Sequence, residues 1–429
     1  MRTRISVLLL AVCACASAQV QAIRAARMVD VKSGAIVEHP VILVEAGRIN
    51  AVGPDLKPPA NATVIDLGDV TLLPGFIDCH THLFHRYSPY IGDGDSLVLE
   101  ANEMSTAKRA LLSTKMAMED LLAGFTTVRD VGNSGVSGAV ALREAIDEGW
   151  VVGPRVVACT RALSPLGGQF PKLTPEAQAL VTQEYVPISG VEEAKRAVRQ
   201  AVLDGADCIK VIADSGDLLL SQEELEAIVQ EAHRLKRKVA AHAIAEEGVW
   251  NAIRAGVDSI EHAYTLTEDQ AKLMAQKKIF LVPTDMPLKE WLLGLDITPA
   301  QQKRVETNYG YFTLHCRQRL ALAIRNGVKI AAGSDSYGDR KPLTRGQTSR
   351  LMLQSYAESG MAPIEVLRST TSNAAELLGL QDEIGSLEPG KTADIVAVNG
   401  DPLRNPEALQ KVCFVMKAGM VVKSVKSGD

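Results

Sequence analysis

The sequence of 429 residues predicts an α/β protein: a (β/α)8 TIM barrel with a small β-sandwich domain built from both chain ends. Three observations support this prediction. Short apolar runs alternate with amphipathic stretches in the middle of the chain, histidines follow several of these runs, and strand-like segments occupy both ends. The order of the segments predicts a signal peptide at 1–18, sandwich parts at 19–70 and 381–429, and a metal-dependent barrel at 71–380.

The first eighteen residues are typical of an export signal. Arg2 and Arg4 precede an apolar run at 5–15 that is too short to span a bilayer, and Ala16-Ser17-Ala18 offers a small-residue cleavage site. Cleavage after Ala18 predicts a periplasmic or secreted protein. Lipidation of Cys15 and an uncleaved apolar N-terminus are the alternatives.

Composition narrows the class of partner. Hydrophobic residues make up 46% of the chain, which is enough for a sizeable core, and no segment after the signal is long and apolar enough to cross a membrane. The formal net charge is −5, and both signs are interspersed along the chain. This balance argues against a nucleic-acid partner.

The cysteines give no recognisable framework. Two of the seven lie within the signal, and the other five are odd in number, scattered and without CxxC spacing. Three of these stand in apolar, strand-like runs, which indicates small buried hydrophobes; an oxidising compartment would permit disulfides, but the sequence demands none. The five are Cys79, Cys159, Cys208, Cys316 and Cys413.

Both chain ends read as short strands joined by turns. Neither end is long enough to form a stable core alone, so we expect the two to pair in one sandwich. The predicted strands are Arg24–Val29, Val41–Glu45, Arg48–Val52 and Thr63–Asp66 at one end and Ile395–Val398, Val412–Ala418 and Met420–Val422 at the other.

Helices and strands alternate between these ends. A helix expected at 221–238 begins with a capping box of Ser221 and Glu224, and Thr267 with Gln270 opens another helix in the same way. The intervening strands are near-continuous apolar runs, as expected where both faces of a sheet are buried. They are predicted at 73–78, 126–131, 154–159, 208–212, 238–243, 259–263, 280–284 and 329–334.

Eight parallel strands with intervening helices make a barrel. A doubly wound open sheet is the alternative, and it would need a glycine-rich phosphate loop after its first strand. The sequence at 75–80, Gly-Phe-Ile-Asp-Cys-His, is no such loop. The barrel is therefore the favoured architecture.

Histidine and acid residues fall at the ends of the predicted strands. His80 and His82 close the first strand, and alternate residues of a strand point the same way, so both imidazoles aim at one place. His242, His262 and Asp335 end the fifth, sixth and eighth strands. Because barrel enzymes assemble their chemistry at the carboxyl ends of the strands, this set predicts a site for zinc or a similar divalent ion.

Lys210 ends the fourth strand between apolar residues. A bare ammonium there would be costly and would repel metal ions. A carbamate formed with carbon dioxide would reverse the charge and offer one oxygen to each of two metals. A lysine paired with an acid across the barrel explains the position equally well.

The remaining histidines are assigned lesser roles. His85, three residues past the His80–His82 pair, is expected to be a polar residue of a rim loop rather than a ligand. Three further histidines lie away from the strand ends and are interpreted as bystanders: His39, His233 and His315.

Several segments resemble a known family. The stretch PGFIDCHTHL at 74–83 resembles the first-strand signature of the amidohydrolase superfamily, and IGSLEPGKTADI at 384–395 resembles the point where that family's chain re-enters its small β-domain. Residues 238–263 and 371–402 are similar to the branch that holds imidazolonepropionase-like proteins, prolidase-like carboxypeptidases and ochratoxin A-hydrolysing amidohydrolases. The similarity runs across nearly the whole mature chain.

The resemblance implies a site with two divalent metal ions, zinc foremost, and a homo-oligomer. His80 and His82 would hold one ion, His242 and His262 would hold the other, and N6-carboxylated Lys210 would bridge them. A further ligand of the first ion would act as general base. That residue is Asp335.

Three departures from the family pattern concern the substrate pocket. Relatives often carry a histidine where this chain has Ile244, and Gly-Gly-His where it has Gly-Gly-Gln at 167–169. The acidic residues usual after the eighth strand are replaced by Thr-Arg-Gly-Gln at 344–347. The implied metal ligands are intact, so the departures bear on the substrate rather than on the chemistry.

The expected reaction is hydrolysis of an amide bond to a C-terminal amino acid, in a dipeptide or an N-acyl amino acid such as ochratoxin A. Tyr264, two residues past His262, could donate to the developing oxyanion, or it could be a packed aromatic of the rim. The candidates for contacts with the substrate, three of them guanidinium groups suited to its carboxylate, are Arg161, Arg340, Arg345 and Gln169.

Two alternatives remain. A cyclic amidase or a deaminase acting on a small heterocycle is the enzymatic one; deaminases of this superfamily usually hold one metal and carry a strand-five glutamate in place of the role of Lys210. A non-catalytic metal-binding barrel is the other, and loss of a ligand would favour it.

Overall fold

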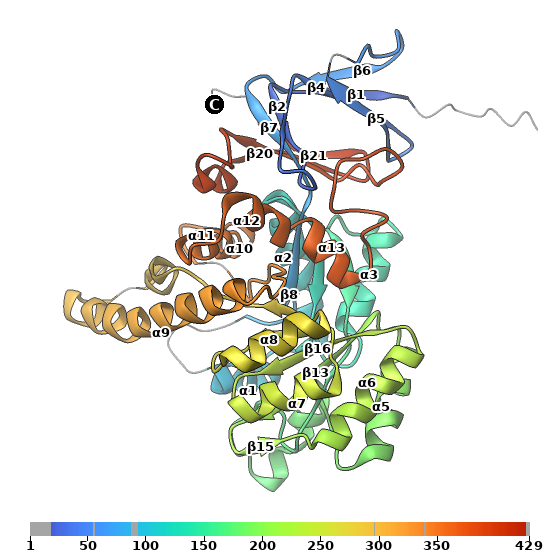
Figure 1. Ribbon diagram of the computed structural model, residues 1–429. Coiled ribbons are helices and arrows are strands. Elements are labelled where there is room, and N and C mark those ends of the chain that lie inside the picture. Colours follow the sequence, from blue (N-terminus) through green and yellow to red (C-terminus); the bar gives the residue numbers. More distant parts are fainter. Residues whose placement is uncertain (1–18, 55, 87–92, 296, 339, 426–429) are drawn as a thin grey trace, which may run out of the picture.

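The structure is a computed structural model that describes residues 19–54, 56–86, 93–295, 297–338 and 340–425. The predicted signal peptide, residues 1–18, lies outside the described residues. The fold is α/β: two sheets at one end of the molecule are built from both ends of the chain, and parallel strands flanked by helices form the rest (Figure 1).

The two end sheets share one buried core. Their strand orders are β5-β4-β1-β6 and β21-β20-β19-β7-β2-β3, and β7 pairs with β19, so the two ends of the chain meet. Ile23 and Ile42 of the first sheet and Ile395 and Phe414 of the second belong to a single cluster of buried side chains. The strands are β1 Gln21–Arg24, β2 Arg27–Val29, β3 Ile36–Glu38, β4 Pro40–Glu45, β5 Arg48–Pro54, β6 Thr63–Asp66, β7 Val70–Pro74, β19 Ile395–Asn399, β20 Val412–Lys417 and β21 Met420–Ser424.

The single strand expected at Arg24–Val29 is in fact two strands in different sheets. The chain leaves β1 at Arg24, and the N–H of Ala26 donates to the carbonyl of Gly68 before β2 begins at Arg27. The crossing falls at Ala25-Ala26, where the sequence has no glycine, proline or other turn residue to mark it.

The central strands are parallel. They form one sheet in the order β10-β9-β8 and another in the order β12-β11-β13-β16-β17-β18. Bridges join Cys159 to Cys208 and Leu281 to Ile330, and the N–H of Cys79 donates to the carbonyl of Ala332, which brings segment 329–334 beside β8. The strands are β8 Phe76–Thr81, β9 Phe125–Asp130, β10 Arg155–Ala158, β11 Ala162–Ser164, β12 Tyr185–Pro187, β13 Cys208–Ile212, β16 Lys238–Ala243, β17 Ser259–His262 and β18 Phe280–Val282.

The first predicted strand, 73–78, is displaced in the structure. The strand predicted at 73–78 is interrupted at Pro74-Gly75, where the chain passes from β7 of the end sheet to β8 of the central strands. Gly75 has no room for a side chain, because an added Cβ would lie 2.1 Å from Oγ1 of Thr126. The strand that carries His80 therefore begins at Phe76 and runs to Thr81.

Segment 329–334 is not a regular strand, and two short strands were not expected. Ile330 makes an isolated bridge to Leu281, after which the chain turns toward Asp335. β11 and β12 each have three residues, too few for a periodic signal. A two-residue pair, β14 Asp214–Ser215 and β15 Leu218–Leu219, follows β13.

Helices flank the central strands (Figure 1). Both predicted capping boxes are present, at Ser221–Glu224 and Thr267–Gln270, but the helix predicted to reach residue 238 ends at Arg234. The helices are α1 Asp93–Glu103, α2 Thr106–Leu122, α3 Gly138–Asp147, α4 Ala179–Glu184, α5 Val191–Leu203, α6 Gln222–Arg234, α7 Glu246–Ala255, α8 Glu268–Lys277, α9 Pro299–Arg325, α10 Arg345–Ser349, α11 Leu351–Glu358, α12 Pro363–Ser369 and α13 Ser372–Leu378, with short 3-10 turns η1 Pro175–Ala177, η2 Leu288–Leu292 and η3 Pro406–Gln410.

The sequence permitted a disulfide without demanding one, and one is present. Cys159 and Cys208, the first residue of β13, form a disulfide, and Cys79, Cys316 and Cys413 are buried thiols. The two partners are 49 residues apart in sequence and meet only because their segments pair.

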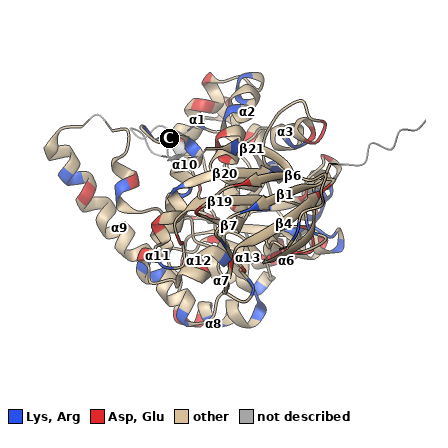
Figure 2. Ribbon diagram, turned by 90° about the horizontal axis from the view of Figure 1, so that it is seen from above, with Lys and Arg blue, Asp and Glu red and all other residues tan. Residues whose placement is uncertain are grey.

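The surface carries both charges. Figure 2 shows Lys and Arg interspersed with Asp and Glu along the outer helices, in agreement with the near balance of charges in the sequence. Within the described part of the chain, no helix meets the length and apolarity needed to cross a bilayer.

Candidate active site

The carboxyl ends of the central strands bring the predicted ligands to one edge. Ile212 pairs with His242 across β13 and β16, and Ala243 pairs with His262 across β16 and β17. Lys210, two residues before Ile212, therefore lies on the same strand face as Ile212, next to the strand of His242. The N–H of Asp335 donates to the carbonyl of His80 at 2.9 Å, which fixes the last acid beside the first strand.

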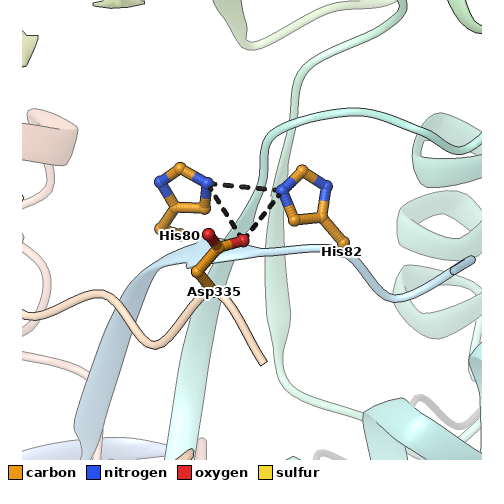
Figure 3. Close-up of side chains that lie close together, drawn as sticks. All are labelled: His80, His82 and Asp335. Atoms are coloured by element: carbon orange, nitrogen blue, oxygen red, sulfur yellow. Dashed lines mark hydrogen bonds and ion pairs between the residues drawn. The ribbon is translucent and has the colours of Figure 1, made fainter. Parts of the chain in front are cut away.

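His80, His82 and Asp335 converge on one point (Figure 3). The Nε2 atoms of the two imidazoles lie 3.3 Å apart, and Oδ1 of Asp335 lies 3.5 Å from the first and 3.4 Å from the second. These three ligand atoms form a candidate metal-binding group. Imidazole nitrogen with carboxylate oxygen is the donor set of zinc and related divalent ions.

Hydrogen bonds hold both imidazoles in the form that binds a metal. Nδ1 of His80 lies 2.7 Å from a carboxylate oxygen of Glu261, and Nδ1 of His82 lies 3.0 Å from the carbonyl of Gly132. Both partners are acceptors, so each Nδ1 carries the proton and each Nε2 presents its lone pair. Burial lowers the pKa of His80 to about 4, which also keeps this ring neutral.

His262 is oriented in the same way. Its Nδ1 lies 2.8 Å from the hydroxyl of Thr284, and that hydroxyl donates to the carbonyl of Pro283 at 2.7 Å. The hydroxyl can then only accept from the ring, so Nδ1 of His262 is the protonated nitrogen and Nε2 is free to bind a metal.

The group fits a cation. Oδ1 of Asp335 is buried and has no hydrogen-bond partner among the described residues, although two imidazole nitrogens lie within 3.5 Å of it. Three acceptor atoms that face one another without a donor are stabilised by a positive ion. Burial would raise the pKa of Asp335, but His80 and His82 hold it well below its ordinary value, so the carboxylate is ionised.

A second set adjoins the first. The rings of His242 and His262 lie 4.6 Å apart between centroids, and the ring of His262 lies 5.1 Å from that of His80. Burial lowers the pKa of His242 to about 3, so this imidazole is neutral as well. The four imidazoles thus form one continuous cluster.

Lys210 is buried at the same cluster without a partner. Its side chain is 3% exposed, and no hydrogen bond or ion pair to its ammonium group is found among the residues that the structure describes. Burial lowers its pKa from 10.5 to about 8. The charges of Glu261 and Asp335 act in the opposite direction and raise this pKa, but neither acid is in direct contact with Lys210 among the described residues.

Sequence reasoning missed Glu261. This buried carboxylate accepts from the guanidinium of Arg129 at 2.9 Å and from the hydroxyl of Ser259 at 2.5 Å, besides its contact with His80. Burial opposes its ionisation, but Arg129 and His80 lower its pKa to about 2. Its only signal in the sequence is an acid immediately before His262 in an otherwise apolar strand.

Asp78 was also overlooked. Its Oδ1 accepts from the backbone N–H of His80 at 3.1 Å and of Ser334 at 3.0 Å, which ties the strand of the first ligand to the loop of Asp335. Burial raises its pKa to about 6.

Three site residues adopt left-handed backbone conformations. The φ angles are +69° at His262, +59° at Thr284 and +51° at Asp335. Such angles are uncommon in residues with a Cβ, and they cluster where function constrains the chain. Here they turn the two ligands and their hydrogen-bond partner inward as the strands end.

Tyr264 lies against the cluster, and its hydroxyl makes no hydrogen bond to any of the residues described. Its ring is 5.5 Å from that of His262 and 5.1 Å from that of Phe312, and the guanidinium of Arg319 lies 5.8 Å above it. Burial, followed by the charge of Asp335, raises the pKa of Tyr264, so the phenol is a proton donor at neutral pH. This position is compatible with both roles considered for Tyr264, because its ring packs against neighbouring aromatic residues and its hydroxyl can still donate a hydrogen bond.

A cavity of about 940 Å³ opens above the cluster. Asp335, Tyr264 and Thr284 lie in its lining, and η2, α9 and the segments 334–338 and 340–341 supply most of the remainder. This volume suits a small organic substrate.

The predicted substrate contacts fare differently. Gln169 places its amide nitrogen 3.4 Å from both ring nitrogens of His242, and Arg340 lines the cavity while paired with Glu290 at 2.9 Å. Two predicted contacts are corrected. Arg161 donates to the carbonyl of Thr182 and is not part of the cavity lining, and Arg345 is 0% exposed because its guanidinium is paired with Asp120.

Arg86 is a cation that sequence reasoning passed over. It lines the cavity one residue after His85, it is exposed, and none of the described residues offers its guanidinium a carboxylate. Lys341 lines the same cavity and is also exposed. The signal was a basic residue in the loop that follows the His80–His82 pair.

The other histidines are not at the metal-binding group. His85 is buried and pairs with Glu100, with its ring 5.1 Å from that of Tyr337. His315 contacts the carbonyl of Tyr264 at 2.6 Å. His233 pairs with Asp258 on the surface, and His39 stands in a turn at a φ of +48°.

Comparison with known proteins gives one consistent result. A model of the amidohydrolase family matches residues 71–429. Ochratoxinase from Aspergillus niger is 31% identical over 383 residues, which are 82% of this chain and 75% of that protein. Imidazolonepropionase from Sphingopyxis alaskensis is 26% identical over 402 residues, which are 86% of this chain and 88% of that protein.

Solved structures agree. The crystal structure of a prolidase complexed with N-methylphosphonate-L-proline superposes with a TM-score of 0.81 at 28% identity, and the match covers 95% of this chain and 100% of that one.

Proposed function

Because the chain belongs to the amidohydrolase family and is a hydrolase of C–N bonds, we propose that it is a binuclear amide hydrolase that releases a C-terminal amino acid from dipeptides or N-acyl amino acids. One observation carries this proposal. The Nε2 lone pairs of His80 and His82 face Oδ1 of Asp335, which has no hydrogen-bond partner among the described residues.

We assign the ligands by position. His80, His82 and Asp335 would hold one ion, and His242 and His262 would hold the second. Lys210, N6-carboxylated, would bridge the two ions; its burial without a partner supports this, because a carbamate would turn an unpaired cation into a ligand. Zinc suits these nitrogen and oxygen donors.

Divalent ions at such a site acidify water to hydroxide near neutral pH and polarise the scissile carbonyl. Asp335 is the general base: its ionised carboxylate takes the proton of the attacking water and passes it to the leaving amine. The phenol of Tyr264 donates to the oxygen of the carbonyl as negative charge develops there.

The carboxylate of the substrate needs a cation in the cavity. Arg86 is exposed in the lining, and no described acid is paired with its guanidinium, although Glu100 accepts from its backbone N–H; Arg340 is paired with Glu290. Arg86 is therefore our first candidate for the bidentate contact, with Arg340 second. Ochratoxin A, an aromatic acid amide-linked to phenylalanine, combines an acyl group with such a carboxylate, and we include it among the substrates.

A small cyclic amide is the second candidate substrate, supported by the likeness to imidazolonepropionase. The size of the cavity favours the larger acyl amino acids. Hydrolysis of a ring amide without release of any amino acid would select the cyclic substrate.

We further propose the architecture and location that the sequence predicts. The chain of contacts from β8 through the parallel strands to segment 329–334 supports a closed (β/α)8 barrel at 71–380, and the shared core of the end sheets supports a sandwich of 19–70 with 381–429. The Cys159–Cys208 disulfide supports export to an oxidising compartment after cleavage of 1–18. We also propose that the protein forms a homo-oligomer, on the basis of the family resemblance alone.

The test measures metal content and amino acid release together. Purified mature protein should contain about two divalent ions per chain and should release phenylalanine from a panel of N-acyl-phenylalanines that includes ochratoxin A. Lys210→Ala should lose both properties. One metal or none, with no amide cleaved, would overturn the proposal.

A further inference from the structure

Four aromatic residues of the cavity lining are in contact with one another, although aromatic residues make up only 4% of the chain; a fifth, Tyr337, lies apart from them against His82. We name the four residues Tyr264, Trp291, Tyr309 and Phe312 the aromatic wall. Trp291 stacks on Tyr309 with ring centroids 4.2 Å apart and contacts Phe312 edge-on at 6.2 Å. Phe312 in turn meets Tyr264 at 5.1 Å, so the four rings form one connected surface from η2 and α9 to the end of β17.

The aromatic wall lies on one side of the metal-binding group. Tyr264 brings it to His262, the ligand that β17 supplies. The guanidinium of Arg86, which has no acid partner among the described residues, belongs to the other side. It lies next to Gly338, and the ring of the neighbouring Tyr337 stacks on that of His82, the ligand that follows β8. A substrate whose carboxylate is held at Arg86 and whose amide lies over Asp335 therefore extends its acyl group toward the wall.

The acids beside the wall are already engaged by arginines. Arg319 lies over the ring of Tyr264, and its partner Asp285 is already engaged by it. Arg340 and Glu290 neutralise each other in the same lining. The acids of the described lining are Glu290, which is paired with Arg340, and Asp335, which belongs to the metal-binding group. The N-terminal ammonium of a dipeptide would thus find no available carboxylate at the wall, whereas a neutral aromatic acyl group would gain ring contacts there.

We propose that the aromatic wall is the acyl subsite of this enzyme and that it selects N-aroyl amino acids over dipeptides and short N-acyl amino acids. The proposal rests on the amide hydrolase function. An aryl group gains offset or edge-on ring contacts that an acetyl group lacks, and each such contact changes affinity about 3- to 10-fold.

Three substrates with the same leaving group test this proposal: N-(2-naphthoyl)-, N-(cyclohexanecarbonyl)- and N-acetyl-L-phenylalanine. We expect kcat/KM to be highest for the naphthoyl compound, by at least about 10-fold over acetyl, because it alone presents an aromatic acyl group. The cyclohexyl compound separates aromatic contact from apolar bulk. Equal kcat/KM values for the three substrates would overturn the proposal.

Phe312→Leu removes one ring from the wall and keeps an apolar side chain there. It should lower kcat/KM for the naphthoyl substrate about 3- to 10-fold and leave that for the acetyl substrate within a factor of about two. Tyr311→Leu is the matched control, because Tyr311 is the preceding residue of α9, is 74% exposed and does not line the cavity. An equal loss of kcat/KM for both substrates, in a variant with the Tm of the parent, would contradict the proposed role of the wall. Trp291→Leu applies the same test to the ring that η2 contributes.

Binding separates this inference from the proposed function. Calorimetry with N-(2-naphthoyl)-D-phenylalanine and N-acetyl-D-phenylalanine measures the contribution of the aromatic wall to binding affinity in the absence of turnover. Tighter binding of the naphthoyl ligand that depends on Phe312, with no hydrolysis of any L-substrate, would support the wall and overturn the hydrolase proposal. Hydrolysis of all three substrates with no aryl preference in rate or binding would overturn the wall alone.

Discussion

Glu261 never touches the atoms that would bind metal, yet it decides how His80 presents them. Its carboxylate fixes the proton of His80 on Nδ1 and is itself held by Arg129 and Ser259. Outer carboxylates of this kind raise the basicity of a ligand histidine and hold its ring in place.

Replacing Glu261 by glutamine should therefore weaken metal binding about 10- to 100-fold without removing a ligand. Competition with a fluorescent chelator measures this affinity. Glu376→Gln is the control, since Glu376 pairs with Lys329 on the surface. Unchanged affinity in a Glu261→Gln protein that is folded would show that the carboxylate serves stability alone.

Lys210 carries the bridging role in our assignment. Protein supplied with isotopically labelled bicarbonate should show one carbamate signal by carbon NMR, and the signal should vanish in Lys210→Ala. Lys238→Ala is the control, because Lys238 lies on the neighbouring strand β16 in an exposed pair with Asp258. A labelled signal that survives in Lys210→Ala, or a metal content that does not change, would contradict the assignment.

Arg86 is expected to act on substrate binding. Arg86→Gln should raise KM for substrates with a free carboxylate about 10- to 100-fold, because a charge-assisted hydrogen bond contributes about 1.5–3 kcal/mol. Steady-state kinetics with N-acyl-phenylalanine and its amide measures the effect, which should be absent for the amide. Arg161→Gln should change neither value, since Arg161 is outside the cavity lining.

The sequence allowed the candidate ligands to be named but not the residues that support them. His80, His82, His242 and His262 stand at the ends of apolar runs, and that contrast is visible in one dimension. Glu261 acts through His80, a residue 181 positions away, and no local pattern records such a contact.

Arg345 is the opposite case, a residue to which the sequence suggested a functional role that its burial does not allow. An arginine after the last strand suggested a contact with the substrate, but a buried partner on α2, Asp120, takes its charge instead. Burial of a charged side chain depends on what packs against it from elsewhere in the chain, so sequence position alone misassigned this residue.

At the scale of elements, strands were predicted best where the apolar residues of the strand are followed and preceded by polar or turn-forming residues. Thr63–Asp66 was predicted with its observed bounds, whereas Pro74-Gly75 lies inside an apolar run and still divides two sheets. The division arises from a close approach to Thr126 that only the fold reveals.

Two helical glycines should respond in opposite directions to alanine. Gly248 lies near the start of α7, where an added Cβ would be 1.8 Å from a carboxylate oxygen of Asp214, so Gly248→Ala should lower the Tm. Gly310 lies within α9 with nothing within 4 Å, so Gly310→Ala should stabilise by about 0.5–1 kcal/mol. Thermal melts of both variants test the packing at α7, and a rise in Tm for Gly248→Ala would contradict it.

At the scale of the whole molecule, the disulfide shows why some features escape the sequence. Cys159 and Cys208 have no diagnostic spacing, and they become neighbours only when the segments around them pair. The same pairing sets β13, the strand of Lys210, beside the segment that follows β10.

Removing the disulfide should destabilise the folded chain. Substitution of both cysteines by alanine should cost about 2–4 kcal/mol, because the bond closes a loop of 49 residues in the unfolded chain. Denaturant unfolding of the double variant, compared with the parent with and without reductant, measures the loss. Reductant should not shift the double variant, and equal stability of parent and variant would show that the bond is not formed in solution.

The most direct test of the account is a zinc titration of metal-free mature protein in bicarbonate, with release of phenylalanine from N-benzoyl-phenylalanine as the signal. The account predicts that activity rises until about two equivalents are bound per chain and then stays constant. Saturation at one equivalent, or no release of phenylalanine at any ratio, would contradict a binuclear amide hydrolase.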